Sequence, residues 1–188
     1  MKRNIRWITY TAVMLALLIC LQWVGSLIPE QMTKQLVTGT MVNCVLAMTV
    51  LLVGRSAGVT VAVISPVCAF VLGIAPNLIT VAPIMAGNVC YVLLLKALMA
   101  KAFWRQITAV AVASAVKFAV LYVLVVRIIC GAASGALLGQ KLGQTVLLAP
   151  PMLKMLPTMF TWPQLITALA GGAIALSIYP LVKSMKRN

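Results

Sequence analysis

The chain has 188 residues, of which 63% are hydrophobic and 9% are charged. A soluble domain of this size cannot bury so much apolar surface, so the composition indicates a membrane protein. The formal charge is +14, but the basic residues stand in small groups between long apolar stretches, which argues against a basic nucleic-acid-binding surface.

Six apolar stretches are long enough to form membrane helices, each of which needs about 20 residues. The first has the charge pattern of a signal peptide, but it is too long and no small-residue cleavage site follows it, so we expect a retained helix. The charge-free stretch from Ser56 to Leu95 is too long for one helix, and Pro76-Asn77 divides it. The expected spans are residues 7–28, 36–53, 57–74, 78–99, 107–129 and 162–182.

The basic residues predict how these spans are oriented. In a six-span arrangement one side carries Lys2, Arg3, Arg6, Arg55, Lys96, Lys101, Arg105, Lys183, Lys186 and Arg187. The other side carries Lys34, Arg127, Lys141, Lys154 and the only acidic residue, Glu30. Cytoplasmic loops hold the excess of Lys and Arg, so both termini are expected in the cytoplasm. All four tryptophans lie near expected span ends, as in an aromatic belt.

One connection, residues 130–161, is long. It is too apolar for a free loop and too interrupted by Gly and Pro to span a membrane. Irregular backbone at membrane depth has to be buried in protein or line a cavity, so we expect an outer capping loop. A passive connector at the membrane interface is the alternative. The expected fold is thus an all-α, compact six-helix bundle in which residues 1–188 form a single transmembrane domain.

Lys117 lies near the middle of the fifth span. A lysine at this depth costs about 2.5–3.5 kcal/mol on insertion scales. Its ammonium group is too far from either helix end to reach water easily. We therefore expect Lys117 to face a cavity inside the bundle and to bind a ligand. The alternative is a packing lysine that donates to backbone carbonyl groups.

Other polar residues could share this cavity. Asn88 and Tyr91 are three residues apart, so they lie on one helix face. A single amide in a span is explained by one helix–helix hydrogen bond, worth about 0.6 kcal/mol. Taken together, these residues predict a polar pocket that opens to the outside with Lys117 at its floor. The candidate residues are Asn43, Asn88, Tyr91, Asn77, Trp162 and Gln164, with Gln22 near the outer side.

The chain lacks the residue sets that catalysis requires. It contains no His and a single carboxylate side chain, and its five cysteines are scattered. Acid–base pairs, nucleophile–base pairs, zinc ligands and a phosphate-binding loop are therefore absent from the sequence. We expect no enzyme activity, no cofactor and no metal. Because Lys117 is the charged residue at depth, the ligand is expected to be neutral or anionic rather than cationic.

Two segments carry a resemblance to a known family. Ala12 and Ala16 form a strip of small residues in the first span, which allows another helix to approach closely. The last span reads Trp162-Pro163-Gln164-Leu165-Ile166-Thr167-Ala168-Leu169 and continues with Gly171-Gly172. With six spans, cytoplasmic termini, fewer than 200 residues and a capped outer pocket, the chain resembles the substrate-binding S component of an energy-coupling factor (ECF) transporter. Its last span resembles that of uncharacterised members.

This resemblance implies a protein of the bacterial plasma membrane that binds a vitamin or similar micronutrient from outside. It implies docking through Ala12 and Ala16 on a transmembrane coupling subunit, which works with two cytoplasmic ATPases. Two other functions remain open from the residues: a structural or assembly subunit of a membrane complex, and a small independent facilitator. A self-contained transporter built from two inverted repeats is disfavoured, since the two halves of the chain do not match.

Overall fold

The computed structural model describes residues 2–74, 77–143 and 145–185, and 83% of it is helical. The chain forms α1 (Lys2–Ser26), α2 (Gln31–Leu52), α3 (Arg55–Val71), a short 3-10 turn η1 (Leu78–Thr80) and α4 (Val81–Leu98). It continues with α5 (Phe103–Leu121), the π-helical segment η2 (Tyr122–Ala132), α6 (Ser134–Leu137), β1 (Lys141–Leu142), β2 (Thr145–Val146), α7 (Met152–Met159) and α8 (Trp162–Met185). The expected all-α class is confirmed.

Among the described residues, five helical segments are long and apolar enough to cross a membrane. They are Ile5–Ser26, Gln31–Leu52, Leu78–Leu98, Phe103–Ala132 and Met152–Ser184. The third expected span, residues 57–74, corresponds to α3, which has 17 residues and lies at the lower limit of about 17 for a crossing helix. Pro76, expected to divide the third and fourth spans, lies outside the described residues.

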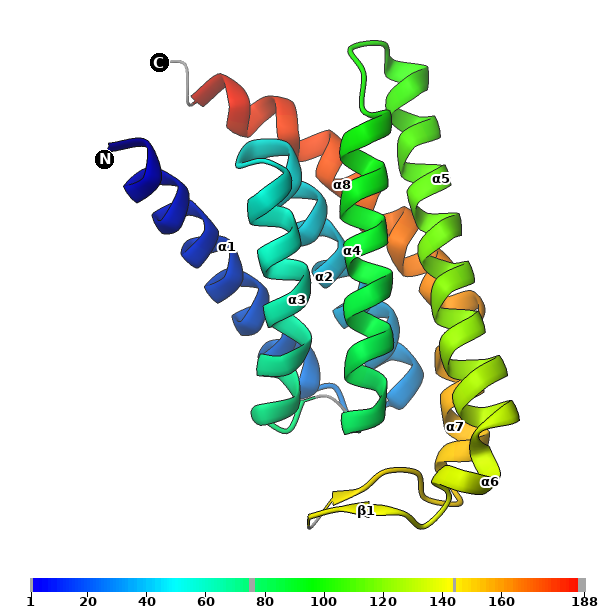
Figure 1. The fold of residues 1–188 in the computed structure, drawn as a ribbon. Coiled ribbons are helices and arrows are strands. Elements are labelled where there is room, and N and C mark those ends of the chain that lie inside the picture. Colours follow the sequence, from blue (N-terminus) through cyan, green and yellow to red (C-terminus); the bar gives the residue numbers. More distant parts are fainter. Residues whose placement is uncertain (1, 75–76, 144, 186–188) are drawn as a thin grey trace.

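The two ends of the bundle differ. Figure 1 shows the start of α1 and the end of α8 at one end, here called the terminal end, and α6, α7 and β1 at the other, here called the cap end. Because the helices alternate in direction, Arg55, Lys96, Lys101, Arg105 and Lys183 lie toward the terminal end. Lys186 and Arg187, and the side chains of Lys2 and Arg3, lie outside the described part. Lys34, Arg127, Lys141 and Lys154 lie toward the cap end.

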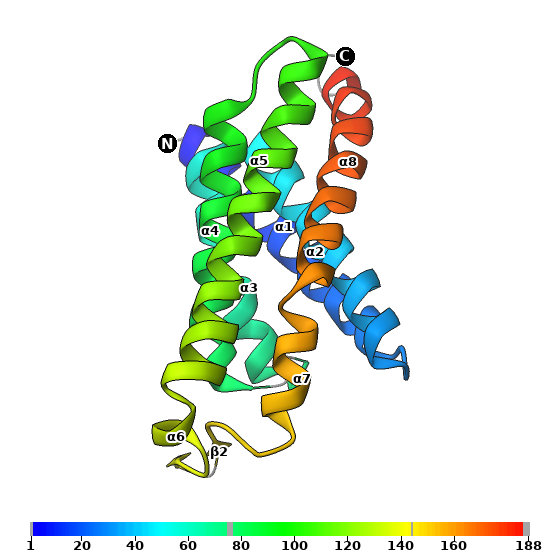
Figure 2. The same cartoon turned by 90° about the vertical axis from the view of Figure 1, so that its right-hand side faces the viewer.

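The main core lies between α2, α3, α4, α5 and α8. Its buried members include Leu46, Val50, Val61, Val92 and Leu95. Helix α2 packs on α8, α4 packs on α5 and α3, and α1 contacts α2 and α3 (Figures 1 and 2). Residues 171 and 172 are glycines because α8 approaches its neighbours closely there: a Cβ on Gly171 would lie 2.6 Å from the Thr40 carbonyl oxygen.

Residues 130–161 are more regular than a capping loop. Their first residues belong to η2, which extends α5 beyond the expected end of the span at residue 129, and α7 is helical. Apolar residues of α5, η2 and α7 share a second core at the cap end: Leu121, Val125, Ile129, Leu148, Leu156, Met159 and Phe160. Asn77 links this segment to the residues that precede α4, since its Nδ2 donates a hydrogen bond to the Leu147 carbonyl oxygen at 2.6 Å. Burial of these apolar side chains orders the segment over the cap end.

Glu30 begins α2. Its carboxylate accepts hydrogen bonds from the backbone N–H groups of Met32, at 2.8 Å, and Thr33. Hydrogen bonds from Thr33, through its side chain and backbone, and from Met32 lower the pKa of Glu30 below its usual value. The only carboxylate side chain of the protein is therefore ionised at neutral pH and used as a helix cap.

Candidate functional site

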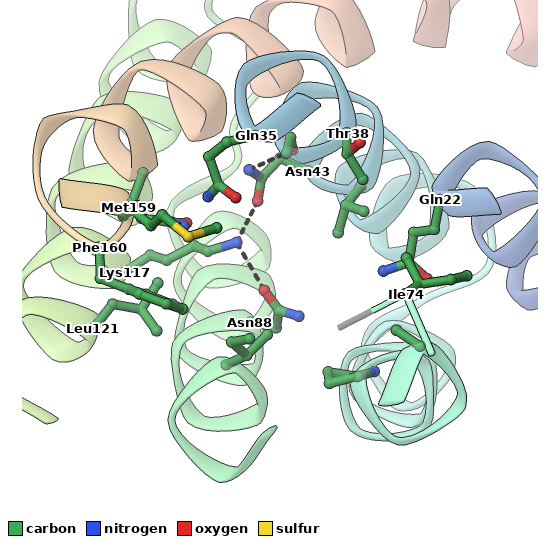
Figure 3. A pocket seen from close by; sticks show the side chains of 16 residues that line it. Gln22, Gln35, Thr38, Asn43, Ile74, Asn88, Lys117, Leu121, Met159 and Phe160 are labelled. Atoms are coloured by element: carbon green, nitrogen blue, oxygen red, sulfur yellow. Dashed lines mark hydrogen bonds between the residues drawn. The ribbon is translucent and has the colours of Figure 1, made fainter. Parts of the chain in front are cut away.

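Lys117 lies inside the bundle and is only 3% exposed. Its Nζ donates to Asn43 Oδ1 at 2.5 Å and to Asn88 Oδ1 at 2.7 Å (Figure 3). The Tyr91 ring lies beneath the ammonium group, 5.5 Å from Nζ to the ring centroid. An ammonium group has three donors, so one N–H of Lys117 has no hydrogen-bond partner among the described residues.

Three helices hold this arrangement in place. Asn43 comes from α2, and its Nδ2 donates to the Gly39 carbonyl oxygen at 2.8 Å and to Thr167 Oγ1 of α8 at 3.4 Å. Anchoring the amide nitrogen in this way turns the amide oxygen toward Lys117. Tyr91 of α4 donates its hydroxyl to the Ala168 carbonyl oxygen at 3.4 Å. The ammonium group is thus positioned by neutral acceptors and an aromatic face, with no carboxylate beside it.

A cavity of about 140 Å³, here called the deep cavity, adjoins Lys117. It is lined by Gln22, Gln35, Thr38, Gly39, Val42, Asn43, Pro66, Ala69, Ile74, Ile84, Asn88, Lys117, Leu121, Met159, Phe160 and Gln164. A second hollow of about 260 Å³, here called the mouth, shares Gln35, Thr38, Ile74 and Met159 with it and adds Ser26, Gln31 and Lys34. These added residues flank the α1–α2 connection, so the site opens toward the cap end.

Two polar atoms in the lining have no hydrogen-bond partner within the described ranges. They are Gln22 Oε1 and Thr38 Oγ1, and both are buried. An unsatisfied buried polar group costs about 1–3 kcal/mol. The residues Gln22 and Thr38 both line the deep cavity, so its wall is partly polar.

The structure brings together most of the residues that the sequence singled out. Asn43, Asn88, Lys117 and Gln164 line the deep cavity, as does Gln22. Tyr91 is not in the lining, but the face of its ring contacts the Lys117 ammonium group.

Asn77 and Trp162 lie elsewhere. Asn77 turns away from the cavity, because its Nδ2 bonds the Leu147 carbonyl oxygen and Met152 Sδ of the cap segment. Trp162 begins α8, is 50% exposed and does not line the deep cavity.

Other lining residues were missed at the sequence level. Gln35 and Gly39 precede Asn43 by eight and four positions, so helical spacing could have placed them on its face. Met159 and Phe160 carried no such signal, since they reach the cavity only because α7 docks on η2 and α8.

The interface residues expected on α1 are accessible. Ala12 and Ala16 are exposed on a face that packs on no other helix in the described chain, whereas Thr11 and Leu18 face the bundle. The described residues contain no group of three or more His, Cys, Asp or Glu side chains that could hold a metal ion.

No family model, curated protein or solved structure matches this chain. Its function is therefore inferred from the site itself.

Proposed function

We propose that the protein is the substrate-specificity (S) subunit of an ECF-type importer in a bacterial plasma membrane. It binds a small neutral or anionic solute, such as a vitamin or similar micronutrient, from outside the cell. The observation that carries this proposal is the Lys117 ammonium group, which is buried, lacks a carboxylate partner and faces a cavity open toward the cap end. Buried ionisable groups at membrane depth commonly mark substrate sites.

The distribution of charge supports uptake from the cap end. Basic residues are concentrated at the terminal end, which supports a cytoplasmic terminal end and an outer cap end. A solute then enters through the mouth beside Lys34 and moves past α7 toward the terminal end until it reaches Lys117. The inner half of the core is closed by apolar side chains such as Leu46, Val50 and Leu95, which disfavours an independent facilitator.

The energy for release into the cell has to come from partners. The chain has no phosphate-binding loop of its own, so ATP hydrolysis belongs to other subunits. We assign these roles to a transmembrane coupling subunit and two cytoplasmic ATPases. The exposed Ala12–Ala16 strip on α1 suits close packing against a helix of the coupling subunit.

An assembly subunit without a ligand is the second candidate. The observation that favours it is the capping of Lys117 by Asn43 and Asn88, since a purely structural lysine needs such acceptors. The deep cavity beside Lys117 and the third N–H of its ammonium group, unpartnered in the described chain, favour ligand binding instead.

Mass spectrometry of small molecules released from the detergent-purified protein separates these two functions. We expect one polar solute at a ratio of about one per chain, because the deep cavity is a single site with fixed polar groups. Recovery of lipid and detergent only, with no solute that raises the melting temperature in a vitamin screen, would contradict the proposal and favour an assembly subunit.

Bulky residues on α1 test the coupling step. We expect Ala12→Trp together with Ala16→Trp to leave solute binding intact and to reduce uptake at least tenfold, since the wider face blocks helix approach. Uptake by whole cells that express the coupling module and binding by the purified protein are the two measurements. Ala115→Trp, at an exposed position on α5, is the matched control and should leave uptake unchanged. Normal uptake by the α1 variant would exclude this face as the interface.

A further inference from the structure

The size of the deep cavity limits the solute that it can hold. Its volume is about 140 Å³. Apolar protein cavities of about 150 Å³ accommodate a benzene molecule, which is close to one aromatic ring. A second fused ring would exceed this volume, so it would have to displace Met159 or Phe160, which are packed in the second core, or extend out into the mouth. The deep cavity therefore suits a single ring.

The charge of the deep cavity selects one end of the solute. Lys117 keeps one N–H without a partner in the described chain, and the only carboxylate side chain, Glu30, caps α2 instead. An uncompensated charge in a low-dielectric interior is unfavourable, so an anion bound there gains a strong, charge-assisted hydrogen bond. Figure 3 shows Asn88 with its oxygen toward Lys117 and its amide nitrogen on the opposite side, toward Gln22. The unpartnered N–H of Lys117 is therefore the donor that a carboxylate can meet at this position.

The remaining walls divide into apolar sides and a polar edge. Leu121 and Phe160 lie on one side of the cavity and Ile74 on the other (Figure 3). These side chains give the cavity apolar walls. Gln22 and Thr38 also line the cavity and give it a polar edge. A hydrogen-bonding group on the ring can meet the Gln22 amide there.

From these features we infer that the solute is a flat, single-ring carboxylate with a hydrogen-bonding group on the edge opposite the carboxylate. The carboxylate binds Lys117, the ring lies among the apolar walls, and the group on the far edge meets Gln22. This inference rests on the proposed function and narrows its neutral or anionic solute to one chemical class.

A set of matched compounds tests the class. The probe is 4-hydroxybenzoate, titrated into the full chain from which the native solute has been removed. 4-Hydroxybenzamide removes the charge, 4-hydroxybenzylamine reverses it, and 6-hydroxy-2-naphthoate adds a ring. We expect 4-hydroxybenzoate to bind at least tenfold more tightly than each of the other three. In the Lys117→Met variant the acid should lose its advantage over the amide.

Two results would overturn the inference. One is equal or tighter binding of the amine or the naphthoate, and the other is no binding by any of the four compounds. Neither result decides the proposed function, which depends on the mass of the solute released from the native protein. A recovered solute with several rings or without an acidic group would overturn the single-ring carboxylate and leave the binding subunit standing.

Discussion

Replacing Lys117 with methionine is expected to weaken binding of the native solute at least tenfold and to leave the protein folded. Methionine retains most of the side-chain volume but cannot donate to an acceptor on the solute. Loss of one partner of a buried charge-assisted hydrogen bond costs about 2–5 kcal/mol, and about 1.4 kcal/mol already corresponds to tenfold in affinity. Isothermal titration with the recovered solute measures this change.

The stability of the Lys117→Met variant follows from two opposing contributions. Removing a buried charge is favourable by up to about 2.5–3.5 kcal/mol on insertion scales. Asn43 Oδ1 and Asn88 Oδ1 then lose their shared donor, and each unsatisfied buried acceptor costs about 1–3 kcal/mol, which is about 2–6 kcal/mol for the two. The two contributions have opposite signs and overlapping sizes, so the melting temperature of the free protein should change little.

Ser114→Ala is the matched control for this variant. Ser114 is buried one turn before Lys117 on α5, and its hydroxyl has neither a hydrogen-bond partner in the described chain nor a place in the cavity lining. Its replacement should leave solute affinity unchanged. If folded Lys117→Met bound the solute with the affinity of the original protein, Lys117 would be a packing residue and not part of the site.

Replacing Gly171 with alanine is expected to destabilise the protein by about 1–3 kcal/mol, the usual cost of an added methyl group in a tightly packed core. The new Cβ would lie 2.6 Å from the Thr40 carbonyl oxygen and 2.7 Å from both Asn43 Cβ and Cys44 N. Two of these atoms are backbone, so α2 and α8 have to separate. Separation moves Asn43 relative to Lys117, and solute affinity should fall as well.

Thermal unfolding in detergent and solute titration of the same sample measure both effects of Gly171→Ala. The matched control is Gly135→Ala, because an added Cβ at Gly135 meets no atom within 4 Å. The free energy of unfolding of that variant should lie within about 0.5 kcal/mol of the value for the original protein, as it usually does for exposed substitutions. A Gly171→Ala protein with unchanged melting temperature and affinity would show that close contact between α2 and α8 is not required.

The helical segments could be predicted from the sequence because their length and apolar composition are local properties. A stretch such as residues 107–129 excludes water wherever it lies, and its backbone can satisfy its own hydrogen bonds only as a helix. The residues at which such helices end depend on tertiary contacts as well. The extension of α5 through η2 to Ala132 depends on burial of Val125 and Ile129 against α7 and the cap segment, which no local pattern reveals.

The interior position of Lys117 was also determined by the sequence, since exposing a mid-span ammonium group to lipid is energetically unfavourable. Which groups meet it was decided by the tertiary structure. Asn43 and Asn88 lie 74 and 29 residues away along the chain, and they reach Lys117 only because α2 and α4 pack beside α5. Asn77 is chemically the same residue, yet contact with Leu147 turns it toward the cap segment. Amide side chains form hydrogen bonds with whatever partners the packing supplies, so their roles depend on the assembled helices.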